Sequence, residues 1–207
     1  MDWMIFQDLA NRMGYPMNYQ SAEEVFTEIG QVAPSYAGMS YPRLEGDGLC
    51  WPCPTADHPG TQYLHKDRFS RGKGLFHAID YRPPAEEPDG DYPFWLTTGR
   101  SYVHYHTGTM TRVSPHLDRE MPELIMEIHP EDARALELLD GAWARISSRR
   151  GSILSKVQLT ERIGKGVVFL PFHFAENAAN VLTNAALDPI AKIPEYKVCA
   201  VKLEKAA

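Results

Sequence analysis

The sequence predicts a mainly β protein with some α-helix, in which a small β-barrel follows a helical and irregular segment. Six short apolar runs with strand character are crowded into residues 91–207, where only one helix is expected. Two amphipathic segments open the chain, and a long stretch rich in proline, glycine and aromatic residues follows them. Many short strands with few helices are typical of a barrel rather than of an alternating α/β sheet. We therefore divide the chain into residues 1–90 and 91–207.

Two short helices are expected at the start of the chain. Residues 2–13 place apolar side chains at helical spacing, and Gly14 stands where a helix commonly ends. The second helix begins at Ser21, whose hydroxyl can cap the backbone while Glu24 reaches back to form a capping box. The apolar face of this second helix consists of Val25, Phe26 and Ile29.

Residues 33–91 lack the periodicity of either helix or strand. An irregular stretch of this length is uncommon inside a compact domain, and it is usually functional or laid over a neighbouring surface. Large aromatic side chains favour the second interpretation. They are Trp51, Tyr63, Phe69 and Phe76.

The remainder of the chain is predicted to be rich in strands, which are bounded by turn residues. A hairpin turn is expected at residues 149–151. One compact helix has Pro130 in its first turn and ends near residues 140–141, with Ala133, Leu136 and Leu139 on its buried side. The predicted strands are residues 94–98, 124–128, 142–147, 152–159, 167–172 and 198–203.

The composition is that of a globular protein, with 43% apolar and 23% charged residues. A formal net charge of -6 argues against a protein whose main partner is nucleic acid. The first six residues lack the features of a secretory signal, and no apolar run reaches membrane-spanning length, so a cytoplasmic protein is expected. Three cysteines are too few for a disulfide framework and fit a reducing compartment.

The densest polar cluster directly follows the first predicted strand and spans residues 97–112. It holds hydroxyl groups, two glycines that expose backbone amides, and two arginines. A pyrophosphate or the edge of a pterin needs partners of this kind. We interpret the cluster as a ligand-binding loop, and the alternative is a polar loop that bonds only to itself.

His104 and His106 lie two residues apart, so in an extended segment both rings would face the same side and could hold a metal. No carboxylate or thiol at ligand spacing accompanies them. We therefore expect hydrogen-bonding groups here, and no metal site is predicted for this chain.

Two further motifs are interpreted structurally. Cys50 and Cys53 form a CxxC pattern, but a zinc or iron–sulfur site would need two more ligands at matched spacing, and Cys199 alone does not supply them. We expect ordinary buried or half-buried thiols. Residues 65–74 gather four cationic side chains with two glycines but lack P-loop spacing, so they are expected to form a basic loop that faces solvent or a partner.

A second polar group of residues spans 172–184 and continues at 194–197. Asparagine and threonine side chains there present both donors and acceptors, which suits recognition of a purine or pterin edge. The alternative is turn and cap chemistry, for which asparagine is equally suited.

Several strings resemble the molybdopterin oxidoreductases, and in particular the catalytic subunits of cytosolic formate dehydrogenases. They are TTGRSYVHYHTGTMTR, SRRG, GVVFLPFHFAENAANVLTN and DPIAKIPEYK. GLCWPCPTADHPGTQYLHKDRFSRGKG is similar to the same subunits, so the resemblance covers essentially all 207 residues. It implies the carboxy-terminal portion of such a subunit, with residues 91–207 folded as a double-psi β-barrel that binds two molybdopterin guanine dinucleotides.

The resemblance also implies which residues bind the cofactor. The residues that would line one dinucleotide are Thr98, Gly99, Arg100, His104, His106, Thr107, Met110 and Thr111. The residues that would contact the pterin or guanine ends are Phe172, His173, Asn180, Thr183, Asn184, Tyr196 and Lys197.

Family members carry, upstream, a cysteine cluster for an iron–sulfur centre, the cysteine or selenocysteine that ligates the metal, and the histidine and arginine that act on formate. This sequence contains none of them, so no catalytic residue is predicted in the chain. A larger partner chain is expected to supply the iron–sulfur and metal-ligand domains, share the cofactor, and connect to further electron-transfer subunits. Neither nucleic acid nor membrane insertion is expected.

The activity that the resemblance implies is interconversion of formate and carbon dioxide at a molybdenum or tungsten centre. The barrel would contribute binding, orientation and hydrogen bonds to the pterins. Two alternatives stay open. One is a separately encoded barrel subunit of a related enzyme, of the formylmethanofuran dehydrogenase or nitrate reductase type, and the other is a non-catalytic module that serves assembly.

Overall fold

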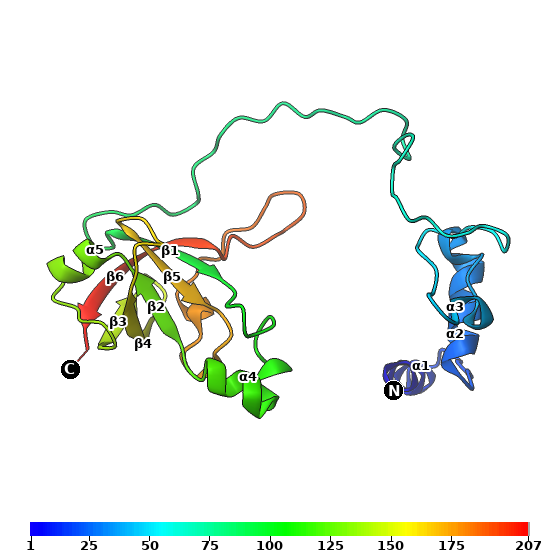
Figure 1. Cartoon of the computed structure of the whole chain (residues 1–207), viewed down its shortest axis with the longest axis horizontal. Coiled ribbons are helices and arrows are strands. Elements are labelled where there is room, and N and C mark those ends of the chain that lie inside the picture. The colour runs from blue at the N-terminus through cyan, green and yellow to red at the C-terminus, as the bar shows by residue number, and fades with distance from the viewer. Residues whose placement is uncertain (207) are drawn as a thin grey trace. The chain divides into compact units, whose positions relative to one another are not determined.

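The computed structural model describes residues 1–206, which form two units (Figure 1). Unit 1 comprises Met1–Ala78, and unit 2 begins at Ile79. Among the described residues, none of the helices has the length and apolar character needed to cross a membrane. The regular elements of unit 1 are α1 (Asp2–Arg12), α2 (Ala22–Val32), η1 (Pro34–Tyr36) and α3 (Tyr41–Leu44).

The first two helices confirm the predictions from their capping residues. Gly14, just beyond α1, has a φ of +83°, which glycine adopts without strain. The Ser21 hydroxyl accepts a hydrogen bond from the Glu24 amide at 3.2 Å and so caps α2. The Glu24 carboxylate accepts from the Gln20 amide at 2.7 Å, one residue earlier than in the usual capping box.

The irregular part of unit 1 is organised around one arginine. The Arg43 guanidinium donates to the carbonyl of His58 at 2.7 Å and to that of Thr55 at 3.4 Å. Cys53 is fully buried beside this arginine, whereas Cys50 is exposed. The two thiols of the CxxC pattern are thus unpaired in the described chain, and one of them packs as a small apolar side chain.

Unit 2 is a closed barrel of six strands in the order β1-β5-β2-β4-β3-β6 (Figure 1). All six predicted strands are confirmed, with ends shifted by at most two residues. Alternating burial explains the success, because strands that close a barrel put every second side chain inside. The strands are β1 (Phe94–Gly99), β2 (Ile125–Ile128), β3 (Trp143–Ser147), β4 (Ser152–Leu159), β5 (Val167–Pro171) and β6 (Val198–Lys205).

The strand pairing has an internal twofold pattern. Exchanging β1, β2 and β3 with β4, β5 and β6 leaves every pair and its direction unchanged: β1–β5 and β2–β4 are parallel, and the other four pairs are antiparallel. This is the connectivity of a double-psi β-barrel, which confirms the fold class expected from the resemblance. β5 lies between β1 and β2, and β2 lies between β4 and β5, so the loops after β1 and β4 each cross the end of one strand.

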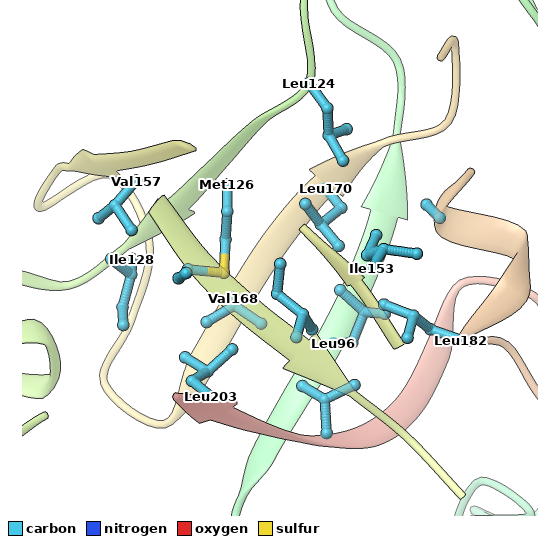
Figure 2. Close-up of a cluster of buried hydrophobic side chains, with 14 of the residues drawn as sticks. Leu96, Leu124, Met126, Ile128, Ile153, Val157, Val168, Leu170, Leu182 and Leu203 are labelled. Carbon is cyan, nitrogen blue, oxygen red and sulfur yellow. The ribbon is translucent and has the colours of Figure 1, made fainter. Parts of the chain in front are cut away.

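Apolar side chains fill the barrel interior and meet from all six strands (Figure 2). Burial of this set supplies the main driving force for folding of unit 2. Its labelled members in Figure 2 are Leu96, Leu124, Met126, Ile128, Ile153, Val157, Val168, Leu170, Leu182 and Leu203.

The predicted helix after β2 is shorter than expected. α5 (Pro130–Ala135) ends well before residues 140–141. Glu137 then adopts a φ of +55° and turns the chain, so that Leu138 rather than Leu139 enters the core. The assignment of Leu139 to the buried side was therefore wrong, because its side chain is 69% exposed.

A further helix, α4 (Pro115–Glu120), was not predicted. It follows the 3-10 turn η2 (Thr111–Val113). Ser114 followed by proline is a recognisable helix start. The helix was missed because only six residues follow that start, too few to show a period. Two 3-10 turns after β5 complete the unit, η3 (Ala175–Asn177) and η4 (Ala179–Val181).

Replacing Leu170 with alanine is expected to destabilise unit 2 by about 2–5 kcal/mol, because the side chain is fully buried and truncation leaves a cavity. Urea unfolding of the full chain, followed by far-ultraviolet circular dichroism, measures the change. The matched control is Leu139→Ala, which is expected to shift the unfolding free energy by less than about 0.5 kcal/mol. Equal effects of the two substitutions would contradict the placement of Leu170 in the core.

Candidate functional site

The polar residues that the sequence singled out gather at one end of the barrel. β1 and β5 are parallel neighbours, with Gly99 opposite Pro171, so both strands end at the same edge. β6 begins at this edge, since Val198 pairs with Thr97. The loops that leave β1 and β5 therefore meet the segment that enters β6. We call this end of the barrel the polar rim; it comprises residues 98–112, 172–184 and 194–197.

The base of the polar rim is tightly packed. Thr98 is buried, and its hydroxyl donates to the carbonyl of Tyr196 at 2.8 Å, which ties the end of β1 to the start of β6. Gly99 lies against a ring: a Cβ at this position would come within 2.7 Å of the Phe169 side chain. Its carbonyl accepts from the Phe172 amide at 3.2 Å. A residue larger than glycine would displace the ring or the strand.

His173 joins the loop after β5 to the loop after β1. Its side chain is fully buried, and its Nε2 accepts a hydrogen bond from the Ser101 amide at 2.8 Å. Its Nδ1 bonds to the His106 carbonyl, and because a carbonyl only accepts, Nδ1 carries the proton. Burial lowers the pKa of His173, and the neighbouring His104 and Arg100 lower it further. The ring is therefore neutral, with both nitrogens committed to the backbone of the opposite loop.

His104 holds the inside of the loop after β1. Its Nε2 donates to the Met121 carbonyl at 2.7 Å, so its Nδ1 accepts from the Thr111 hydroxyl at 3.1 Å. The Thr111 oxygen in turn accepts from the Tyr105 amide at 3.2 Å. His104 is buried, whereas His106 is exposed and has a φ of +48°. The backbone here is not extended, so the two imidazoles do not face the same side.

Arg112 anchors the far side of the same loop. Its guanidinium contacts Glu176 at 2.8 Å and Asp118 at 3.1 Å, and it lies over the Phe174 ring at 4.9 Å. The hydrogen bond from Arg112 lowers the pKa of Glu176. Gly108 packs beneath the arginine, where a Cβ would come within 2.8 Å of its Cδ atom. Arg112 is not among the residues predicted to bind the cofactor, although it belongs to the polar string after β1.

The asparagines of the second polar stretch show turn chemistry in part. The Asn184 amide donates to the Val198 carbonyl at 3.2 Å, and its oxygen accepts from the Ala186 amide at 3.0 Å. The Thr183 hydroxyl donates to the Asn180 carbonyl at 3.1 Å. Asn184 and Thr183 thus hold the chain between η4 and β6, whereas the Asn180 side chain is exposed.

Other predicted residues present their side chains to the outside of the rim. The Arg100 guanidinium lies 3.3 and 3.4 Å from the two ring nitrogens of His106. The hydroxyls of Thr107 and Thr109 are 3.0 Å apart. The exposed members of the predicted set are Arg100, His106, Thr107, Met110, Asn180 and Lys197. The half-buried members are Gly99, Thr111, Phe172, Thr183, Asn184 and Tyr196.

A cavity of about 540 Å³ borders the rim on the outer wall of the barrel. Arg100, Tyr102 and Phe169 are among its lining residues. Arg162 and Glu127 also line it and form an ion pair with a nitrogen–oxygen distance of 3.1 Å. Arg100 is the only member of the predicted set among its described lining residues, so the cavity touches the rim without containing it.

An ion-pair cluster closes the barrel at the β3–β4 turn, which lies at the same end. Arg149 and Arg150 each contact the Glu86 carboxylate at 2.5 Å, and Arg150 also donates to the Leu182 carbonyl at 2.7 Å. The Glu86 side chain is only 11% exposed. The sequence indicated the turn but not this cluster, because Glu86 lies more than sixty residues away along the chain.

The neutral His173 predicts a pH dependence. Its pKa in the folded protein lies below that in the unfolded chain, so its contribution to stability is complete above the unfolded value and is lost as the pH falls below it. From about pH 7.5 to about pH 5, the unfolding free energy should therefore fall further in the natural protein than in His173→Gln. Urea unfolding at both pH values measures this difference, and parallel losses would contradict it.

Comparison with known proteins gives the family. Residues 94–200 match the family model of the molydopterin dinucleotide binding domain. The chain is 51% identical to the F420-dependent formate dehydrogenase subunit alpha of Methanocaldococcus jannaschii, over 99% of this chain and 31% of that protein. It is 42% identical to the assimilatory nitrate reductase catalytic subunit of Bacillus subtilis, over 98% of this chain and 30% of that protein.

A solved structure shares the fold. Acetylene hydratase from Pelobacter acetylenicus matches 99% of this chain and 32% of its own length, with a TM-score of 0.66 at 15% identity. The chain spans about a third of the length of these relatives. Because the matched model extends over more than half of the chain, from the first barrel strand into the last, the protein belongs to the molydopterin dinucleotide binding domain family.

Proposed function

We propose that this chain supplies the dinucleotide-binding barrel of a molybdenum- or tungsten-dependent formate dehydrogenase, and that the polar rim holds molybdopterin guanine dinucleotide. The observation that carries the proposal is the junction of two polar stretches. Ser101 and His173, which are 72 residues apart in the chain, are joined by a direct hydrogen bond at the ends of two adjacent parallel strands. The family and the similarity to the Methanocaldococcus subunit support the same proposal.

The exposed groups of the rim suit the cofactor. The pyrophosphate of a dinucleotide is anionic and favours cations and hydrogen-bond donors. Arg100 and Lys197 are exposed cations of the rim, and Thr107 and Thr109 present hydroxyls from the loop after β1. The exposed Asn180 amide offers a donor and an acceptor to a purine or pterin edge.

We propose different roles for the exposed and the buried residues of the predicted set. The polar groups of Thr98, His104 and His173 are already satisfied by backbone or side-chain partners. These residues position the loops, while the exposed ones contact the cofactor. The same division gives Asn184 and Thr111 a positioning role. A loop held in its binding conformation loses less entropy when the ligand arrives.

The redox chemistry between formate and carbon dioxide is supplied by the metal and the pterin dithiolenes of the bound cofactor. This chain binds and orients that cofactor. Since the chain spans 31% of the Methanocaldococcus subunit, we assign the iron–sulfur cluster, the metal ligand and the formate-handling residues to a larger partner chain. Two bound dinucleotides, further electron-transfer subunits and a cytoplasmic location belong to the same proposal.

We also propose that residues 1–90 pack on that larger chain. All residues of α1 and α2 are described, and none of them is buried. Helices of eleven residues are marginally stable without packing. Ile5 and Phe6 are each 67% exposed and Phe76 is 98% exposed, so a neighbouring surface is needed to cover them. The Trp3 indole nitrogen, which is buried, also has no partner among the described residues.

One observation favours a second candidate function. A sequence that is 42% identical to this chain belongs to a nitrate reductase catalytic subunit, which favours nitrate as the alternative substrate. The third hypothesis is a non-catalytic module that serves assembly. Assays of the complete enzyme with formate and with nitrate, together with pterin analysis, distinguish the three: formate oxidation supports the proposal, nitrate reduction supports the second, and a complex without pterin supports the third.

Replacing Arg100 with alanine tests the rim. We use a chimera, the Methanocaldococcus subunit alpha in which this chain replaces the matching part. A charge-assisted hydrogen bond contributes about 1.5–3 kcal/mol, so the variant should retain the cofactor roughly tenfold to a hundredfold more weakly. Pterin and metal content after gel filtration measures retention. The control is Arg134→Ala, an exposed arginine of α5 at the opposite end of the barrel. Full retention in the Arg100 variant would refute its assignment.

A further inference from the structure

A hairpin projects beyond the barrel between η4 and β6, and Figure 1 shows it as the orange-red loop. It spans residues 186–195, and we call it the finger. Its two arms meet in a bridge between Leu187 and Pro194. The Asp188 amide donates to the Ile193 carbonyl at 2.9 Å, and the Glu195 amide donates to the Ala186 carbonyl at 2.9 Å. The finger is therefore a hydrogen-bonded hairpin rather than an irregular loop.

The tip of the finger is also organised. The Lys192 amide donates to the Asp188 carbonyl at 3.0 Å, and Lys192 has a φ of +58°. The Asp188 carboxylate accepts from the Ile190 amide at 2.9 Å and from the Ala191 amide. A tip fixed in this way presents its side chains in one conformation, which lowers the entropic cost of docking.

The finger exposes branched apolar side chains to water. Ile190 is 90% exposed, Ile193 is 63% exposed and Leu187 is 55% exposed. Removing these side chains from water would be favourable, because apolar surface is more stable in an apolar environment. Apolar groups gathered at the end of a rigid projection mark an interaction site more often than scattered surface residues do.

The base of the finger is continuous with the polar rim. Tyr196 and Lys197 follow the finger directly, and the Tyr196 carbonyl accepts the Thr98 hydroxyl. Glu195 holds the base to the chain before β1, because its carboxylate accepts from the Ala85 amide at 3.2 Å. The finger thus leaves the barrel at the end assigned to the cofactor.

The loop after β1 exposes a second set of apolar side chains at the same end. Tyr102 is fully exposed, Val113 is 79% exposed and Met110 is 73% exposed. Exposed apolar side chains therefore accompany the polar rim both in the loop after β1 and in the finger before β6. Protein interfaces often surround buried polar contacts with apolar groups that exclude water.

We propose that the finger docks into the larger chain of the catalytic subunit and fixes the barrel over the shared cofactor. This inference rests on the proposed function. The occupant follows from two observations: the relatives extend over about three times the length of this chain, and the finger lies at the end where a shared dinucleotide would face that additional polypeptide.

Thiol labelling in the chimera tests the proposal. Ile190→Cys is prepared in the isolated chain and in the chimera, with the exposed Cys50 replaced by serine in both. We expect maleimide labelling at position 190 to be at least about tenfold slower in the chimera, because a docked side chain reacts only when the interface opens. Leu139→Cys, which is exposed at the opposite end of the barrel, is the control and should change less than about twofold.

The outcomes separate docking from cofactor binding. Equal labelling at position 190 in the chimera and the isolated chain overturns docking, even when pterin is bound. Protection of position 190 in a chimera that holds no pterin supports docking and overturns the proposed function. If position 190 of the isolated chain becomes protected from labelling as the protein concentration rises, the partner is a second copy of this chain and not the larger chain. If phospholipid vesicles protect position 190 of the isolated chain from labelling, the partner is a membrane surface and not the larger chain.

Discussion

The parallel pairing of β1 with β5 is the constraint on which the site depends. Because the two strands run in the same direction, their exit loops leave the barrel at one edge, although 72 residues separate Ser101 from His173. An antiparallel pair would have sent these loops to opposite ends. The twofold strand pattern repeats the same arrangement with β2 and β4, so the fold contains two such junctions, of which the first carries the polar residues.

The two loops at this junction are joined through one buried imidazole, and a second imidazole holds the loop after β1 together. His173 reaches the backbone of the opposite loop with both nitrogens, and His104 connects a hydroxyl with a carbonyl. A buried polar group is costly unless all its partners are present, and a fully satisfied network favours a single arrangement of the loops. Arg112 adds a charged contact across the same gap through Glu176. The rim is therefore preorganised, and its exposed side chains are not part of the buried network that holds the loops.

Much of this architecture was predictable from local patterns. Alternating burial made the six strands visible, and Ser21 and Gly14 marked the ends of the first helices. The errors arose where local patterns compete with tertiary contacts: Leu139 has helical spacing, but the chain turns at Glu137 first. The sequence also indicated which segments are polar. Positioning residues could not be separated from exposed ones in advance, because the partners that decide this lie 14 to 98 residues away.

The two units of the chain differ in what they need in order to fold. The barrel has a continuous apolar core to which all six strands contribute, so its stability is largely internal. α1 and α2, by contrast, bury none of their described residues. The irregular segment around Arg43 is held mainly by hydrogen bonds from the Arg43 guanidinium to backbone carbonyls. Under the proposal that residues 1–90 pack on a larger chain, that chain would cover the apolar side chains of unit 1, whereas the barrel would need cover only at its rim. A chain with these unequal requirements is expected to form its barrel first and to order its first unit on assembly.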